Sequence, residues 1–124
     1  MDDVVKLALT EEGADAERLD QVTGFLRQEL RELDVEDVTP LPAGEAPEGT
    51  RGIDVAAIGG LLVTLGQSTQ AVQTILMTVR AWLGRGGAAH RSVRVEIGGD
   101  VLELTDASTE DQDKLVDLFL RKHG

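Results

Sequence analysis

The chain has 124 residues, enough for one domain with a single hydrophobic core, and its formal net charge is -11 at pH 7. It contains no cysteine, which excludes a disulfide framework, a thiolate zinc site and a cysteine nucleophile. The negative charge argues against a nucleic-acid partner, because most of that affinity comes from basic side chains that neutralise phosphates.

The charge is distributed unevenly along the chain. Acidic side chains dominate residues 1–50 and 96–124, whereas residues 51–95 carry one acidic and five basic side chains. The first residues lack the basic and long apolar stretches that suggest export, and the longest apolar run, residues 55–65, is well short of the roughly 20 residues that cross a bilayer. We therefore expect a cytoplasmic protein that does not enter a membrane.

Apolar and polar side chains alternate along residues 5–10, a pattern typical of a half-buried strand. Asp15 then stands where its side chain can cap a helix, which is expected to continue to about Leu33. The apolar positions of this helix recur every three or four residues, as one buried stripe requires. They are Leu19, Val22, Leu26, Leu30 and Leu33.

A weaker strand candidate follows over residues 35–39, and a right-handed crossover would set it parallel to the first strand. All three prolines of the chain come next. Their fixed φ angles and missing N–H donors predict a Pro-rich loop over residues 40–50. A loop of this length tends to be either functional or disordered.

Residues 54–83 show a helical apolar pattern, which Gly66 and the polar residues after it interrupt. We therefore predict two helices, over residues 54–65 and 69–83. Gly59 and Gly60 would let another backbone approach the first helix closely, because glycines inside a helix are costly without such a reason.

The segment after residue 90, RSVRVEIGGDVLELT, predicts a β-hairpin, because apolar and charged residues alternate on both sides of a glycine pair. Two registers fit this pattern. A turn on the two glycines pairs Arg94 with Glu103, whereas a turn one residue later pairs Ile97 with Leu102 and sets two glutamates opposite each other. The second register is favoured, since hydrophobic pairing usually outweighs one exposed charge pair.

The last segment begins with Ser108 and predicts a helix that ends near His123. Its acids lie in the first turns and its bases in the last, which is the order that the helix dipole favours. The chain therefore reads β-α-(β)-α-α-β-β-α, a single α+β domain over residues 1–124. We expect a small mixed sheet, made of the N-terminal strand, the possible second strand and the C-terminal hairpin, covered by about four helices.

The start of the helix predicted at residue 54 does not have the composition of a phosphate-binding loop. Arg51 and Gly52 precede Asp54, whose carboxylate would repel an anion, and no lysine lies nearby. Asp54 is better explained as a helix cap. Thr50, Arg51 and the loop before them are instead a candidate partner-facing surface.

Other candidates for chemistry are few. Glu110, Asp113 and Asp117 share one face of the last helix, and this pattern favours a solvated face over a metal site. His90 and His123 are the only candidates for acid-base work, and no nucleophile motif accompanies them. We therefore expect no cofactor, no metal and no enzymatic activity.

Trp82 is the only tryptophan, and it has two interpretations. One is a core residue that closes the end of its helix onto the hairpin. The other is a binding hot spot in a basic patch, because tryptophan and arginine dominate many interfaces. The arginines around it in the sequence are Arg80, Arg85, Arg91 and Arg94.

Four segments taken together resemble the effector-associated constant component family of bacterial conflict systems. They are PEGTRGIDVAAIGGLLVTLGQS, VRAWLGR, SVRVEIGGDVLELTDAS and DQDKLVDLFLRKH, and the similarity is densest over residues 47–123. The resemblance implies a small non-enzymatic component that acts beside variable effectors, such as caspase-like or trypsin-like peptidases, in antiphage defence. The residues that match by position are Arg51, Gly52, Asp54, Trp82, Leu83, Gly99 and Asp100.

We therefore expect an adaptor or regulator that recruits or restrains an effector protein, and self-association is left open. One alternative is an acidic, antitoxin-like neutraliser of a basic toxin, whose binding would collapse as salt rises. Another is a small enzyme of unrecognised type, which loss of activity on changing His90 would reveal. The expected interaction residues are Thr50, Arg51, Gly52, Asp54, Arg80, Trp82 and Arg85.

Overall fold

One antiparallel sheet organises the part of the chain that this computed structural model describes, namely residues 4–13, 15–40, 59–66, 70–85, 90–106 and 110–123. The sheet has five strands in the order β2-β3-β1-β4-β5, and each neighbouring pair is antiparallel. The strands are β1 (Val4–Glu11), β2 (Asp37–Pro40), β3 (Gly59–Thr64), β4 (Arg91–Ile97) and β5 (Asp100–Thr105). The helices are α1 (Ala16–Arg31), α2 (Ala71–Gly84) and α3 (Glu110–His123).

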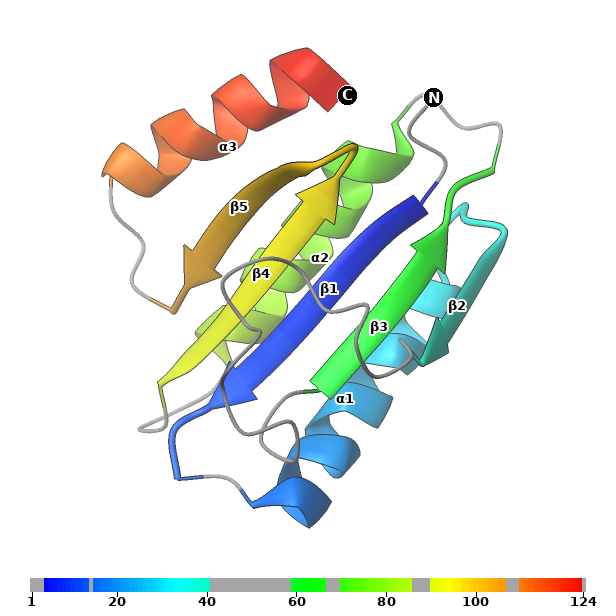
Figure 1. Ribbon diagram of the computed structural model, residues 1–124, viewed down its shortest axis with the longest axis vertical. Helices are drawn as coiled ribbons and strands as arrows, with labels where there is room; N and C mark the ends of the chain where they lie inside the picture. The colour runs from blue at the N-terminus through cyan, green and yellow to red at the C-terminus, as the bar shows by residue number, and fades with distance from the viewer. Residues whose placement is uncertain are drawn as a thin grey trace.

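The first six elements form two interlocked β-α-β units. In space, β3 lies between β1 and β2, and β1 lies between β3 and β4. This β-α-β-β-α-β order is the ferredoxin-like arrangement, to which β5 and α3 are added. Figure 1 shows α1 and α2 together on one face of the sheet, with α3 beside β5. The predicted α+β class is confirmed.

The weaker strand candidate is real, although β2 begins two residues later than the sequence suggested. Because β2 and β1 are both antiparallel to β3, they run in the same direction, as the crossover argument predicted. They do not touch, since β3 separates them. The expectation of a mixed sheet is therefore wrong for the described strands.

The described chain contains three helices rather than about four. The helix predicted over residues 54–65 is wrong for Gly59–Thr64, which form β3, and residues 54–58 lie outside the described ranges. A short apolar run does not by itself distinguish a buried strand from a buried helix. The other helices are confirmed, and Asp15 caps α1 by accepting a hydrogen bond from the backbone nitrogen of Arg18 at 2.8 Å.

The hairpin is also confirmed, but in the register that the sequence analysis did not favour. Arg94 lies opposite Glu103, and their side chains form an ion pair at 2.7 Å. Gly98 and Gly99 form the turn with φ angles of 57° and 90°. A turn one residue later would place Asp100 at a positive φ, which is unfavourable for a residue with a Cβ atom. Hydrophobic pairing did not discriminate between the two registers, because both of them keep the apolar side chains on one face of the sheet.

The core lies between the sheet and the layer of α1 and α2. Alternate residues of each strand point into it, so that β3 and β4 both alternate between buried and half-buried positions. The two helices contribute aliphatic stripes, as their spacing predicted. The strand residues that are less than 2% exposed are Val5, Leu7, Leu9, Val38, Leu61, Val63, Val93, Val95, Ile97 and Leu104.

Gly59 marks a close approach between β3 and α1. A Cβ atom at this position would lie 2.0 Å from the Thr23 hydroxyl oxygen, which is too short for any real contact. Thr23 is held there because its hydroxyl donates to the carbonyl of Leu19 at 2.6 Å. The glycine does allow close packing, but a side chain of a helix approaches a strand here rather than another backbone approaching a helix.

We predict that Gly59→Ala lowers the free energy of unfolding by about 1 to 3 kcal/mol, because the added methyl group overpacks the contact with Thr23. Gly24→Ala on α1 is the matched control. Its new methyl group would meet nothing within 4 Å, so it should raise the stability by about 0.5 to 1 kcal/mol. Urea denaturation followed by circular dichroism measures both changes. A Gly59→Ala chain as stable as the wild type would contradict the close approach.

Candidate functional site

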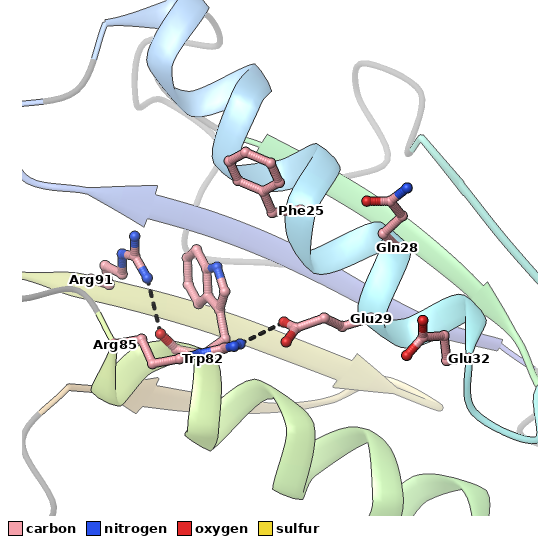
Figure 2. Close-up of a pocket in the computed structure, with 7 residues that line it drawn as sticks. All are labelled: Phe25, Gln28, Glu29, Glu32, Trp82, Arg85 and Arg91. Atoms are coloured by element: carbon pink, nitrogen blue, oxygen red, sulfur yellow. Dashed lines mark hydrogen bonds and ion pairs between the residues drawn. The ribbon is translucent and has the colours of Figure 1, made fainter.

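An open groove of about 570 Å³ lies between α1 and α2, where the end of α2 meets the start of β4. Figure 2 shows the side chains that line it, with Phe25 projecting from α1 above the Trp82 ring in this view. Three lining residues come from α1 and a fourth from the residue that caps its end, and the others come from the end of α2, the residue after it and β4. They are Phe25, Gln28, Glu29, Glu32, Trp82, Arg85 and Arg91.

Trp82 forms the floor of the groove. Its side chain is only 3% exposed and belongs to the hydrophobic core. The guanidinium carbon of Arg91 lies 4.4 Å from the centre of the indole ring, and an Arg91 Nη donates to the Trp82 carbonyl at 3.0 Å. The tryptophan therefore closes the end of α2 onto β4, and the core interpretation of this residue is confirmed.

Arg91 is buried, and it is bonded on several sides. Besides its contacts with Trp82, it donates from Nε to a carboxylate oxygen of Glu11 at 2.9 Å. The other carboxylate oxygen of Glu11 accepts from Arg18 at 3.1 Å. Burial tends to raise the pKa of Glu11, but the hydrogen bonds from Arg91 and Arg18 outweigh it and lower that pKa below its ordinary value.

The rim of the groove is more open than its floor. Phe25 is 57% exposed, although it is a large aromatic side chain. Across the groove, Arg85 and Glu29 form an ion pair at 2.6 Å, and this hydrogen bond raises the pKa of Arg85. Glu32 is exposed and has no ion-pair partner within the described ranges. Since Glu11 and Glu29 neutralise the two arginines, Glu32 leaves the groove slightly acidic.

The arginines around Trp82 in the sequence do not gather into a free cationic patch. Arg80 pairs with Asp113 of α3 on the side of α2 away from the groove, and Arg94 pairs with Glu103 on the sheet. Folding has brought the acidic ends of the chain to its basic middle. A partner-binding role for Arg80, Trp82 and Arg85 stays a prediction.

The remaining predicted interaction residues, Thr50, Arg51, Gly52 and Asp54, lie outside the described ranges. The α1 side of the groove was not predicted from the sequence. One signal was present, because Phe25 is an aromatic residue that falls outside the leucine stripe of its helix. Glu29 and Glu32 carried no such signal, since an acidic residue on an exposed helix face is ordinary.

The two histidines each contact an aspartate. His90 Nδ1 lies 3.0 Å from Asp106 Oδ2, and that hydrogen bond, together with the nearby negative charges, raises the pKa of His90. The side chain of His123 is only 3% exposed, with Nε2 2.9 Å from Asp100 Oδ2, and it ties the end of α3 to the hairpin. Both histidine–aspartate contacts lie at the ends of strands or helices. Among the described side chains, no group of three or more His, Asp or Glu residues is arranged to hold a metal ion.

Comparisons with known proteins do not identify the chain: no family model matches it, and no match was found among curated proteins or solved structures. The resemblance to the effector-associated constant component family therefore stays a prediction. Within the described residues, no helix has the length and apolar content needed to span a membrane. The function has to be inferred from the surfaces that the fold presents.

We predict that Trp82→Ala lowers the free energy of unfolding by about 3 to 5 kcal/mol, because it leaves a large cavity and removes the ring beneath Arg91. Met77→Ala on the same helix is the control. Met77 is 63% exposed, so the change there should stay within about 0.5 kcal/mol. Circular dichroism must follow unfolding, since Trp82 is the only tryptophan. Equal effects of the two substitutions would contradict the core role.

Glu11 should make the stability depend on pH. Its folded-state pKa is lowered, so its contribution is complete above the unfolded-state pKa and is lost as the pH falls through the folded-state pKa. Glu11→Gln should therefore destabilise the protein most at neutral pH and least in strong acid. Urea denaturation at a series of pH values gives the difference. A difference that does not shrink with acidification would show that Glu11 is not held as a carboxylate by Arg91.

Proposed function

We propose that this chain is a non-enzymatic interaction component that binds a partner protein through the α1–α2 groove. The observation that carries the proposal is Phe25, a large aromatic residue held 57% exposed at the rim of an open groove. Aromatic side chains of this kind, beside an ordered and desolvated floor, are typical of residues that dominate binding energy. The floor is ordered because Trp82 and Arg91 hold each other in place.

The charge of the groove indicates the chemistry of the partner. Glu32 is the one groove carboxylate without an ion-pair partner in the described ranges, and the chain as a whole carries a net charge of -11. A basic side chain with an apolar stem fits this arrangement, because the stem can cover Phe25 while the charge approaches Glu32. We therefore expect the partner to present an arginine or lysine within an apolar surface.

The class of the partner comes from the resemblance. In the effector-associated constant component family, the expected partner is a variable effector such as a caspase-like or trypsin-like peptidase. The chain would then recruit or restrain that effector in a bacterial conflict or antiphage defence system. The exposed groove supplies a surface for this role.

An acidic neutraliser of a basic toxin is the second candidate, and the net charge of -11 favours it. The neutraliser and the groove-binding component differ in which part of the surface provides the binding energy. A neutraliser relies on the summed charge, so its affinity collapses between low and physiological salt. Docking in the groove depends instead on one aromatic side chain, and it survives physiological salt.

The test is comparative affinity capture from the source cells with three baits: the wild-type chain, Phe25→Ser and Met77→Ser. Both substitutions change an exposed apolar residue on a helix, but only Phe25 lines the groove. We expect mass spectrometry to find an effector protein on the wild-type and Met77→Ser baits, and at least about tenfold less on Phe25→Ser, since hot-spot residues contribute 2 kcal/mol or more. Equal capture on all three baits at physiological salt would refute the proposal that the partner binds in the groove.

A further inference from the structure

The outer edge of β5 presents main-chain groups that pair with none of the described strands. Among these strands, β5 is the last of the sheet and pairs with β4 alone. The hydrogen bond from the Asp106 nitrogen to the Arg91 carbonyl, at 3.2 Å, fixes which residues of β5 face β4, because the bonding direction alternates along a strand. The residues whose N–H and C=O groups point outward are Val101, Glu103 and Thr105.

A side-chain amide already occupies one position of this edge. The Gln112 side-chain oxygen accepts from the Thr105 nitrogen at 3.0 Å, and the Gln112 side-chain nitrogen donates to the Thr105 carbonyl at 3.4 Å. Gln112 is only 8% exposed, so this pairing is built into the packing of α3. The amide sits where a peptide group of a sixth strand would sit. The edge therefore accepts an amide in strand geometry.

The opposite edge of the sheet is closed in a different way. The Val38 nitrogen donates to its neighbour Asp37 at 2.9 Å, and the Val38 carbonyl accepts from Arg27 at 3.0 Å. β2 also has only four residues and ends in proline, two features that discourage strand addition. Within the described ranges, no comparable bond reaches the outward main-chain groups of Val101 or Glu103.

Helix α3 lies along the open edge and forms a wall beside it. Gln112 near its start holds Thr105, and His123 at its end contacts Asp100, so the helix follows the whole of β5. Figure 1 shows the two elements side by side at the margin of the sheet. An extended segment that paired with β5 would therefore lie against α3.

The flank of α3 on this side carries two exposed leucines. The ion pair of Asp113 with Arg80 places one flank of α3 against α2. At about 100° per residue, Leu115 and Leu118 lie on the other flank, and they are 52% and 59% exposed. The buried stripe between the two flanks consists of Gln112, Val116 and Phe119.

We propose that the edge of β5 and this flank of α3 form a docking surface, which binds an extended segment of a partner protein as a sixth strand. The main chain of the segment pairs with Val101 and Glu103, and its aliphatic side chains pack on Leu115 and Leu118. This surface is separate from the α1–α2 groove. It gives the interaction component a second contact, which works independently of the first.

The chemistry of the partner follows from the charge of this chain. A second copy of the chain is a poor occupant, because each copy carries a net charge of -11 and edge-to-edge pairing would bring two acidic surfaces together. A segment with basic residues on both sides of an alternating aliphatic run fits better. The proposed occupant is therefore a basic, β-forming segment of another protein.

The test is a nuclear magnetic resonance titration of the isotope-labelled chain with a synthetic peptide, in which valine alternates with threonine between pairs of lysines. We expect shifts and slowed hydrogen exchange at the Val101 and Glu103 amides, with shifts at the Leu115 and Leu118 methyl groups. The control peptide carries proline in place of the central valine and should bind much more weakly, because it cannot complete the strand pairing.

Two variants locate the contact. Val101→Pro removes an outward N–H that the pairing with β4 does not use, so the sheet is retained, which circular dichroism checks. It should weaken binding about two- to tenfold, as the loss of one main-chain hydrogen bond predicts, and Leu118→Ser should also weaken binding. Phe25→Ser should leave binding of the peptide to the β5 edge unchanged. The proposal for the β5 edge can therefore fail or hold independently of the proposal for the α1–α2 groove. No shift at millimolar peptide, equal binding of the proline peptide, or shifts confined to the groove would refute the proposal.

Discussion

The buried guanidinium of Arg91 is the interaction on which the groove depends. It joins the start of β4 to β1 through Glu11, and it joins the same strand to α2 through the carbonyl and ring of Trp82. A guanidinium loses its hydration when it is buried, so it is stable only where these partners surround it. Three elements are thereby fixed relative to one another. The floor of the groove is ordered before any partner arrives, which reduces the entropy lost on binding.

The arginines of the middle of the chain also explain how a protein with a net charge of -11 avoids excessive repulsion. Arg85 and Arg91 pair with acids that precede the Pro-rich segment, whereas Arg80 and Arg94 pair with acids near the carboxyl end. Charge that is segregated along the sequence is therefore paired in space. The acids left over define the outer surface, and they favour basic partners for both proposed contacts.

The two proposed contacts use different physics. The groove offers side-chain chemistry, with Phe25 and Glu32 above a fixed aromatic floor, and so it selects a partner by one or two of its side chains. The edge of β5 offers main-chain groups, which give little selectivity for the partner's sequence but require that the bound segment be extended. A partner that engages both would gain avidity, because the second contact forms at a high effective concentration. Neither contact needs a reactive side chain.

By itself the sequence determined the elements whose signals are local: the alternation that makes β1, the capped and striped α1, the hairpin, and the charge order of α3. It offered the core as one of two interpretations of Trp82. It gave no role to Phe25, Glu29 or Glu32, since these come near Trp82 only after two helices distant in the chain pack together. Only the tertiary structure decided that Gly59–Thr64 form a strand, because the gap between β1 and β2 must be bridged by hydrogen bonds. It likewise decided the hairpin register, because Gly98 and Gly99 supply the positive φ angles of the turn and both registers keep the same apolar face. Local signals fix what a segment prefers, whereas pairing and burial depend on which distant segments it meets.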